Sequence, residues 1–166
     1  MSISDVNNIF KVFHSKDWSS YYEFHKEPWK KNIWFKIGDI DEFKFVKDLI
    51  NYDLKKIDED YEVSDWITFL IYEEGDFFGL HTDDVLQYGS NKKKILYTGG
   101  YLLNEDFEGG EFIIDNIKNE AKIGELFLFE RYLKHEVLMV NEGVRYSLHF
   151  AVETNNPNKK IKKSII

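Results

Sequence analysis

The stretch FFGLHTDDVLQ, residues 77–87, contains one histidine and two aspartates within four consecutive positions. The residues before it predict a β-strand. Side chains alternate between the two faces of a strand, so His81 and Asp83 point the same way, with α-carbons about 7 Å apart. Asp84 points to the other face and is the weaker ligand. An imidazole and a carboxylate on one face can bind a single metal ion. We therefore take His81 and Asp83 as candidate metal ligands.

A third ligand has to come from a neighbouring strand. His135 is the best candidate, because it opens the predicted strand KHEVLMV after an exposed turn. Two histidines and one carboxylate on one side of an ion leave its opposite side open, which is the arrangement used by non-haem Fe(II) oxygenases. A histidine–aspartate pair alone often arises by chance, and a single histidine is more often structural. The rest of the chain must therefore supply further support.

Arg145 provides that support, because it begins a mostly apolar strand ten residues after His135. A guanidinium group is costly to bury without an anionic partner. It can bind a carboxylate through two hydrogen bonds, and Ser147, on the same strand face, can add a third. The alternative is an internal salt bridge between Arg145 and an aspartate or glutamate of the chain.

The composition favours one soluble globular domain. The chain has 166 residues, of which 43% are hydrophobic and 17% aromatic. This length is sufficient for a single core. A net charge of −8 argues against nucleic-acid and anionic-membrane partners. Without cysteine, any metal must be bound by histidine, aspartate or glutamate. The start lacks a secretory signal pattern and no stretch approaches a membrane span, so we expect a cytoplasmic protein.

The pattern of apolar residues predicts helices first and strands afterwards. SDVNNIFKVF and DIDEFKFVKDLINYDLKKI have helical spacing, while residues 18–37 between them are ambiguous and suggest a loop with an aromatic strand. From residue 61, short strands alternate with glycine-containing turns. We expect a mainly β fold with flanking helices, in a sandwich or jelly roll. The expected single domain covers residues 1–156, with a helical N-terminal part (1–56) and a jelly-roll core (61–153), followed by a basic tail (157–166).

Three segments together resemble a known family: YEEGDFFGLHTDD, YLLNEDFEGGEFII and GELFLFERYLKHEVLMVNEGVRYSLHF. They are similar to the Fe(II)- and 2-oxoglutarate-dependent dioxygenases, in the prolyl-4-hydroxylase-like branch, over residues 61–152. The resemblance implies a double-stranded β-helix with Fe(II) bound by His81, Asp83 and His135. It implies that Arg145 and Ser147 bind the far carboxylate of 2-oxoglutarate. Tyr72 matches an aromatic residue of that pocket, although a core tyrosine is an equally good interpretation.

The chain also departs from the family pattern. Leu102 stands where relatives often carry a tyrosine, and Tyr101 lies one position earlier. His149 shares the face of Arg145, where relatives usually have a small or apolar residue; it is either a substrate-side proton donor or a hydrogen-bonded residue of the pocket wall. The nucleic-acid demethylases carry Arg-x-Asn-x-Thr-x-Arg. The corresponding positions of this chain are Arg145, Ser147, His149 and Ala151, so only the first of the four residues agrees with the demethylase signature.

The resemblance implies hydroxylation of a C–H bond, with Fe(II), 2-oxoglutarate and O₂ as requirements and ascorbate as a further candidate. The expected substrate is a protein or peptide side chain such as proline, or a small amino-acid-like molecule, and the expected protein is a monomer or homodimer. Two alternatives remain: a cupin-like metalloprotein that does not use 2-oxoglutarate, and a non-catalytic jelly-roll module. Residues 84–93 are predicted to form either a lid over the substrate entrance or an ordinary surface loop.

Overall fold

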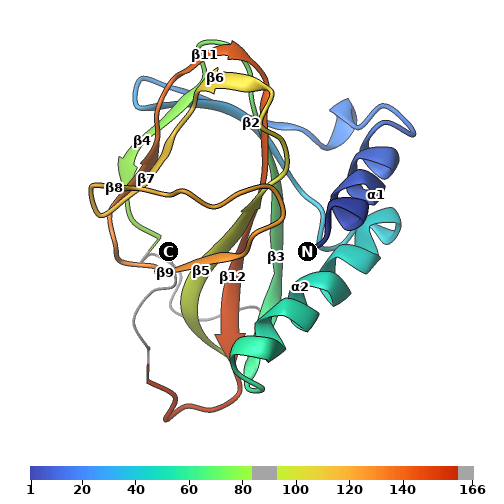
Figure 1. Ribbon diagram of the computed structural model, residues 1–166, viewed down its shortest axis with the longest axis vertical. Coiled ribbons are helices and arrows are strands. Elements are labelled where there is room, and N and C mark those ends of the chain that lie inside the picture. Colours follow the sequence, from blue (N-terminus) through green and yellow to red (C-terminus); the bar gives the residue numbers. More distant parts are fainter. Residues whose placement is uncertain (84–92, 161–166) are drawn as a thin grey trace.

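The computed structural model describes residues 1–83 and 93–160 (Figure 1). Two α-helices, α1 (Ile3–Phe13) and α2 (Lys44–Ile57), lie on one side of the molecule. Of two short 3-10 turns, η1 (Ser19–Tyr21) precedes the first strand and η2 (Asp41–Phe43) leads directly into α2. Helix α1 begins with a capping box in which Ser2 and Asp5 bond to each other's backbone N–H groups. Helix α2 packs on strand β3 through its apolar face, which includes Val46, Ile50 and Leu54.

The described residues form one curled antiparallel sheet of ten strands and a separate two-stranded ribbon. The main order is β8-β7-β10-β4-β2-β3-β12-β5-β9, with β1 paired to β2, and the ribbon is β11-β6. The strands are β1 (Glu23–Glu27), β2 (Lys30–Lys36), β3 (Tyr61–Tyr72), β4 (Phe77–His81), β5 (Lys94–Leu102), β6 (Phe107–Gly109), β7 (Phe112–Ile114), β8 (Ile117–Lys118), β9 (Phe127–Glu130), β10 (His135–Val137), β11 (Val140–Gly143) and β12 (Arg145–Thr154).

Two apolar clusters lie on opposite faces of the long strands β3, β12 and β5. The larger one packs the helices against the outer face and includes Ile50, Phe69 and Leu148. The smaller one fills the inside of the roll and includes Leu70, Phe112, Phe127, Phe129 and Val137. Because strand side chains alternate, the inner face of β12 carries Arg145, Ser147 and His149, between apolar residues that point to the helices. The sheet therefore places polar groups inside the roll.

The N-terminal part is less helical than its sequence suggests. Residues 1–56 contain both helices, but also the hairpin of β1 and β2, and β2 pairs with β3 and β4 of the main sheet. The sequence of β1, EFHKE, is mostly exposed and has no clear apolar alternation, because this strand lies at the edge of the sheet. Strands β6, β8 and β11 are likewise short and exposed, which explains why their patterns did not predict them.

Two predicted features lie wholly or partly outside the described residues. The segment proposed as a lid, residues 84–93, falls there except for Lys93, and so does Asp84. The expected tail is described only to Lys160, and within it Lys159 forms ion pairs with Asp58 (2.6 Å) and Asp60 (2.9 Å). This part of the tail is therefore tied to the turn between α2 and β3.

Candidate metal centre

The two candidate histidines are direct partners across a pair of antiparallel strands. His81 is the last residue of β4, His135 is the first residue of β10, and the sheet register places them opposite each other. Their ring centroids are 4.2 Å apart. Cross-strand partners of this kind have neighbouring side chains on the same face. The strand that His135 was predicted to open therefore brings it to His81.

Asp83 reaches the same point by a different route from the one predicted. Strand β4 ends at His81, so strand alternation does not orient Asp83. Instead, its backbone N–H donates to the carbonyl oxygen of Arg131 (2.7 Å), and the hydroxyl of Thr98 donates to its carboxylate (2.7 Å). The carboxylate lies 3.7 Å from His81 Nε2 and 3.4 Å from His135 Nε2. The three donor atoms lie within 4.8 Å of one another.

The free ring nitrogens of both histidines point to this cluster. His81 Nδ1 contacts the carbonyl oxygen of Gly79 at 2.8 Å, and His135 Nδ1 contacts that of Leu133 at 3.0 Å. A carbonyl oxygen only accepts hydrogen bonds, so each Nδ1 carries the proton and each Nε2 has a lone pair when the ring is neutral. A metal bound at 2.0–2.2 Å would need neighbouring donors about 3 Å apart, near the observed spacing. The residues therefore fit a divalent metal ion.

The electrostatics of the cluster match this interpretation. Burial, followed by the charge of His135, lowers the pKa of His81, which favours the neutral ring that a metal requires. Burial acts to raise the pKa of Asp83, but its interactions with His135 and Thr98 outweigh burial and lower the pKa to about 2. At neutral pH the cluster thus offers one carboxylate and neutral imidazole to a cation.

Arg145 is buried at the far end of the same sheet face, with only 2% of its surface exposed. Its guanidinium donates to the hydroxyl of Ser147 (2.9 Å) and lies 5.5 Å from the ring centroid of Tyr72, its cross-strand partner on β3. Among the described residues, no carboxylate forms an ion pair with Arg145, so the alternative of an internal salt bridge finds no support there. Burial lowers its pKa, which reflects the cost of a desolvated charge. Burial also raises the pKa of Tyr72.

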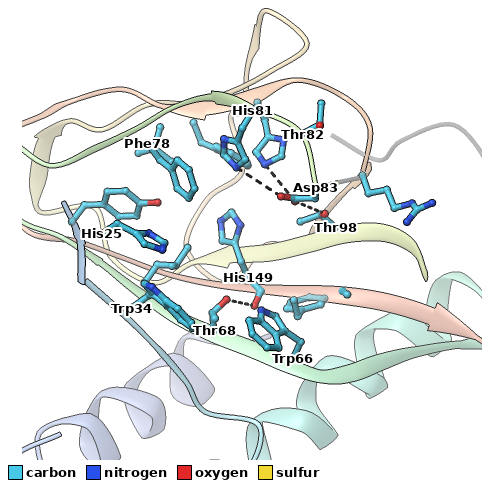
Figure 2. Close-up of a pocket in the computed structure, with 18 of the residues that line it drawn as sticks. His25, Trp34, Trp66, Thr68, Phe78, His81, Thr82, Asp83, Thr98 and His149 are labelled. Carbon is cyan, nitrogen blue, oxygen red and sulfur yellow. Dashed lines mark hydrogen bonds and ion pairs between the residues drawn. The ribbon is translucent and has the colours of Figure 1, made fainter. Parts of the chain in front are cut away.

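A cavity of about 330 Å³ is lined by the metal-ligand candidates His81, Asp83 and His135 and by Tyr72 and His149, whereas Arg145 and Ser147 are not among its lining residues. Figure 2 shows His81 and Asp83 on one side and His149 on the other, above Thr68 and Trp66. The wall also includes Tyr72, whose ring lies in front of Arg145. Several wall residues were not found from the sequence: His25, Trp34, Trp66, Phe78 and Thr98.

The structure also shows where three further residues lie: Tyr101, His149 and His14. The hydroxyl of Tyr101 donates to Asp53 on helix α2 (3.0 Å), so this side chain lies on the outer face and its phenol is not available to the cavity. His149 lines the cavity, but its buried Nε2 lacks the hydrogen-bond partner among the described residues that the predicted wall residue would have. His14 lies at the end of α1, in ring contact with Phe10 and Phe13, away from the cavity.

Comparison with known proteins assigns the chain to a family. A family model described as "Poxvirus C4/C10 protein" matches residues 4–165. The chain belongs to this family. The C4/C10 chain is also 30% identical over 86 residues to the PKHD-type hydroxylase IL0759 of Idiomarina loihiensis. That match covers 49% of the C4/C10 chain but only 39% of the hydroxylase, so the two proteins share a part of their lengths.

Solved structures share the fold of the C4/C10 chain. A 2OG-Fe(II) oxygenase family oxidoreductase from Burkholderia pseudomallei aligns with a TM-score of 0.69 and 14% identity, covering 95% of the C4/C10 chain and 83% of the other. A prolyl hydroxylase from Trichoplax adhaerens, in complex with a hypoxia inducible factor peptide fragment, aligns with a TM-score of 0.63 and 16% identity, covering 93% and 79%. The predicted resemblance and the predicted jelly-roll fold are therefore confirmed. Within the described part of the C4/C10 chain, the helices are too short or too polar to cross a bilayer.

Proposed function

We propose that the chain is an Fe(II)- and 2-oxoglutarate-dependent dioxygenase that hydroxylates a C–H bond, with succinate and CO₂ as co-products. The observation that carries this proposal is the buried Arg145, which has no described carboxylate partner and lies on the same sheet face as a histidine–aspartate–histidine cluster. A dicarboxylate that extends from Arg145 to the metal-ligand cluster would neutralise the guanidinium with one carboxylate and could bind the metal with the other. The relatives named as hydroxylases or 2OG-Fe(II) oxygenases support the same class.

Each residue has a defined role in this proposal. His81, Asp83 and His135 would bind Fe(II), which supplies the redox chemistry that couples decarboxylation of 2-oxoglutarate to hydroxylation of the substrate. Arg145 and Ser147 would bind the far carboxylate through charge-assisted hydrogen bonds. The Tyr72 ring would form the adjacent wall and exclude water from this end of the cavity. The apolar residues of the inner cluster would keep the remaining space dry.

The proposed substrate is a protein or peptide side chain such as proline. The Trichoplax neighbour supports this choice, because that prolyl hydroxylase was solved with a peptide. The aromatic wall around His25, Trp34, Trp66 and Phe78 also suits an apolar side chain rather than a charged one. Ascorbate is part of the proposal as a reductant, and its effect can be measured by omitting it from the assay.

The test is an anaerobic titration of the protein with Fe(II) and then 2-oxoglutarate. A weak visible charge-transfer band that appears only with both additions would report chelation of the metal by the oxo acid. After O₂ is admitted, succinate should form. Asp83→Ala should abolish the band and succinate formation, whereas His14→Ala, which alters a histidine outside the cavity, should leave both unchanged.

Arg145 distinguishes this proposal from the alternatives. Arg145→Met should raise the 2-oxoglutarate concentration needed for half-maximal band intensity by at least tenfold, since loss of a buried charge-assisted pair costs about 2–5 kcal/mol. Fe(II) affinity should change little. A cupin-like metalloprotein would bind Fe(II) without any band that depends on 2-oxoglutarate. A non-catalytic module would form no succinate under any of these conditions.

A further inference from the structure

His149 lies on strand β12 between Arg145 and the part of the strand that pairs with Thr98. On the inner face of β12 it follows Arg145 and Ser147 and precedes Ala151. The register with β5 pairs Ser147 with Leu102, His149 with Gly100, and Ala151 with Thr98. Thr98 is bonded to the metal-ligand candidate Asp83. On the inner face of β12, one neighbour of His149 is therefore Ala151, which pairs with Thr98 beside Asp83. The other neighbour is Ser147, which contacts Arg145.

The imidazole of His149 has no hydrogen-bond partner among the described residues. Its Nε2 is buried and unpaired. The ring makes edge-on contacts with Phe112 (5.3 Å between centroids) and Phe127 (5.7 Å). In Figure 2 it points from the sheet into the cavity, toward the cluster of His81 and Asp83. Burial, followed by the charges of Arg145 and His135, lowers the pKa of His149 to about 3, so the ring is neutral at physiological pH.

A purely structural role does not account for a polar ring at this place. An apolar ring would pack against Phe112 and Phe127 without leaving a buried nitrogen unpaired, and an unpaired buried nitrogen is destabilising. A neutral imidazole carries one proton, which either ring nitrogen can hold, so it can donate one hydrogen bond to an acceptor in the cavity. Under the proposed function, the acceptor at this level is the carboxylate of 2-oxoglutarate that lies at the metal, because Arg145 and Ser147 bind the other one.

We propose that His149 positions the oxo acid by donating a hydrogen bond to its metal-end carboxylate. This inference rests on the proposed function and deepens it. It assigns the two carboxylates to different residues of one strand: the far carboxylate to Arg145 and Ser147, and the metal-end carboxylate to His149. Its role is to position the cosubstrate, so its replacement should lower the affinity only of ligands that have the metal-end carboxylate.

The test compares three ligands on protein loaded with Zn(II), which has no redox chemistry, by ligand-observed NMR. 2-Oxoglutarate has both carboxylates, 4-oxopentanoate lacks the metal-end carboxylate, and 2-oxopentanoate lacks the far one. His149→Phe should weaken 2-oxoglutarate and 2-oxopentanoate about tenfold, the usual effect of losing one hydrogen bond to a charged group. The affinity for 4-oxopentanoate should stay within twofold. Equal weakening of all three ligands, or of none, would overturn the proposal.

Two controls keep the result decisive. His149→Gln retains an N–H donor and should recover part of the loss for 2-oxoglutarate, which also covers the case in which His149→Phe does not fold. His14→Phe makes the same substitution outside the cavity and should change no affinity. If the wild-type protein binds no oxo acid at all, the proposed function fails together with this inference. If the wild type binds 2-oxoglutarate but the variants do not discriminate between ligands, only the role of His149 fails.

Discussion

At the scale of a single residue, Thr98 ties the metal cluster to strand β5. Its hydroxyl donates to the carboxylate of Asp83 at 2.7 Å, and Asp83 lies beyond the end of β4, where no strand pairing restrains its side chain. Groups that bond to a metal ligand fix its orientation, and their removal commonly lowers metal affinity 10–100-fold. Thr98 should therefore matter for metal binding without being a ligand.

We predict that Thr98→Val lowers Fe(II) affinity at least tenfold, because the Asp83 carboxylate loses its fixed orientation while the volume of the side chain is kept. Anaerobic titration with a competing chelator measures this affinity. Thr98→Ser should restore most of it. Thr68→Val is the matched control, since the Thr68 hydroxyl donates to the carbonyl of His149 (3.0 Å) and contacts no ligand candidate. Equal losses in the two valine variants would remove Thr98 from this role.

Among the elements, strand β5 lies close to its neighbours at Gly100. At Gly100, a Cβ atom would lie 2.5 Å from Phe127 Cζ and 2.6 Å from the carbonyl oxygen of Leu148, on β12. The ring of Phe127 could turn aside, but the backbone carbonyl could not without shifting the β5–β12 ladder. This glycine is therefore required by close packing rather than by an unusual backbone angle.

We predict that Gly100→Ala destabilises the fold by about 1–3 kcal/mol, the usual range for overpacking a core. Chemical denaturation followed by circular dichroism measures the loss. Gly75→Ala is the comparison: there a Cβ would meet only the flexible end of Lys31, at 3.9 Å, although the backbone φ of +84° adds some strain. A Gly100 variant as stable as the wild type would show that β5 and β12 can separate easily.

The elements also show what sequence patterns can and cannot predict. The structure places His135 on β10 and Arg145 and Ser147 on β12, within strands that the sequence pattern predicts, and the roles of these residues stay predictions. Asp83 lies in the cluster, but strand alternation does not place it there, because its position depends on contacts with Arg131 and Thr98, which are distant in sequence. The hairpin of β1 and β2 was not predicted, because its exposed residues lack alternation. The sequence therefore did not single out His25, which lies on β1 and lines the cavity.

For the whole molecule, the buried neutral histidines link stability to pH. The pKa of His149 is about 3 in the folded protein and about 6.5 in an unfolded chain, so between these values only the unfolded chain binds the proton. Above pH 6.5 neither state binds this proton, so His149 does not reduce the free energy of unfolding. As the pH falls from 6.5 toward 3, protonation favours the unfolded chain and the free energy of unfolding decreases. The slope is about 1.4 kcal/mol per pH unit for one such group. His81, whose pKa is also lowered, acts in the same direction.

We predict that the metal-free protein loses about 2 kcal/mol of unfolding free energy between pH 6.5 and pH 5 through His149 alone. Urea denaturation at several pH values measures this loss. His149→Phe should show a shallower dependence than the wild type, with the remaining slope due in part to His81. An unchanged slope in this variant would mean that His149 accepts a proton in the folded state without cost.

The pairing of His81 with His135 on adjacent strands has a consequence for the order of folding. The two residues are far apart in the chain and meet only when β4 and β10 have found their register. A slip of one residue would turn one ring to the other face of the sheet. A complete metal centre therefore cannot exist before this late, long-range pairing forms. Metal should hold the finished roll closed and slow its unfolding, while contributing little to the rate at which the chain first collapses.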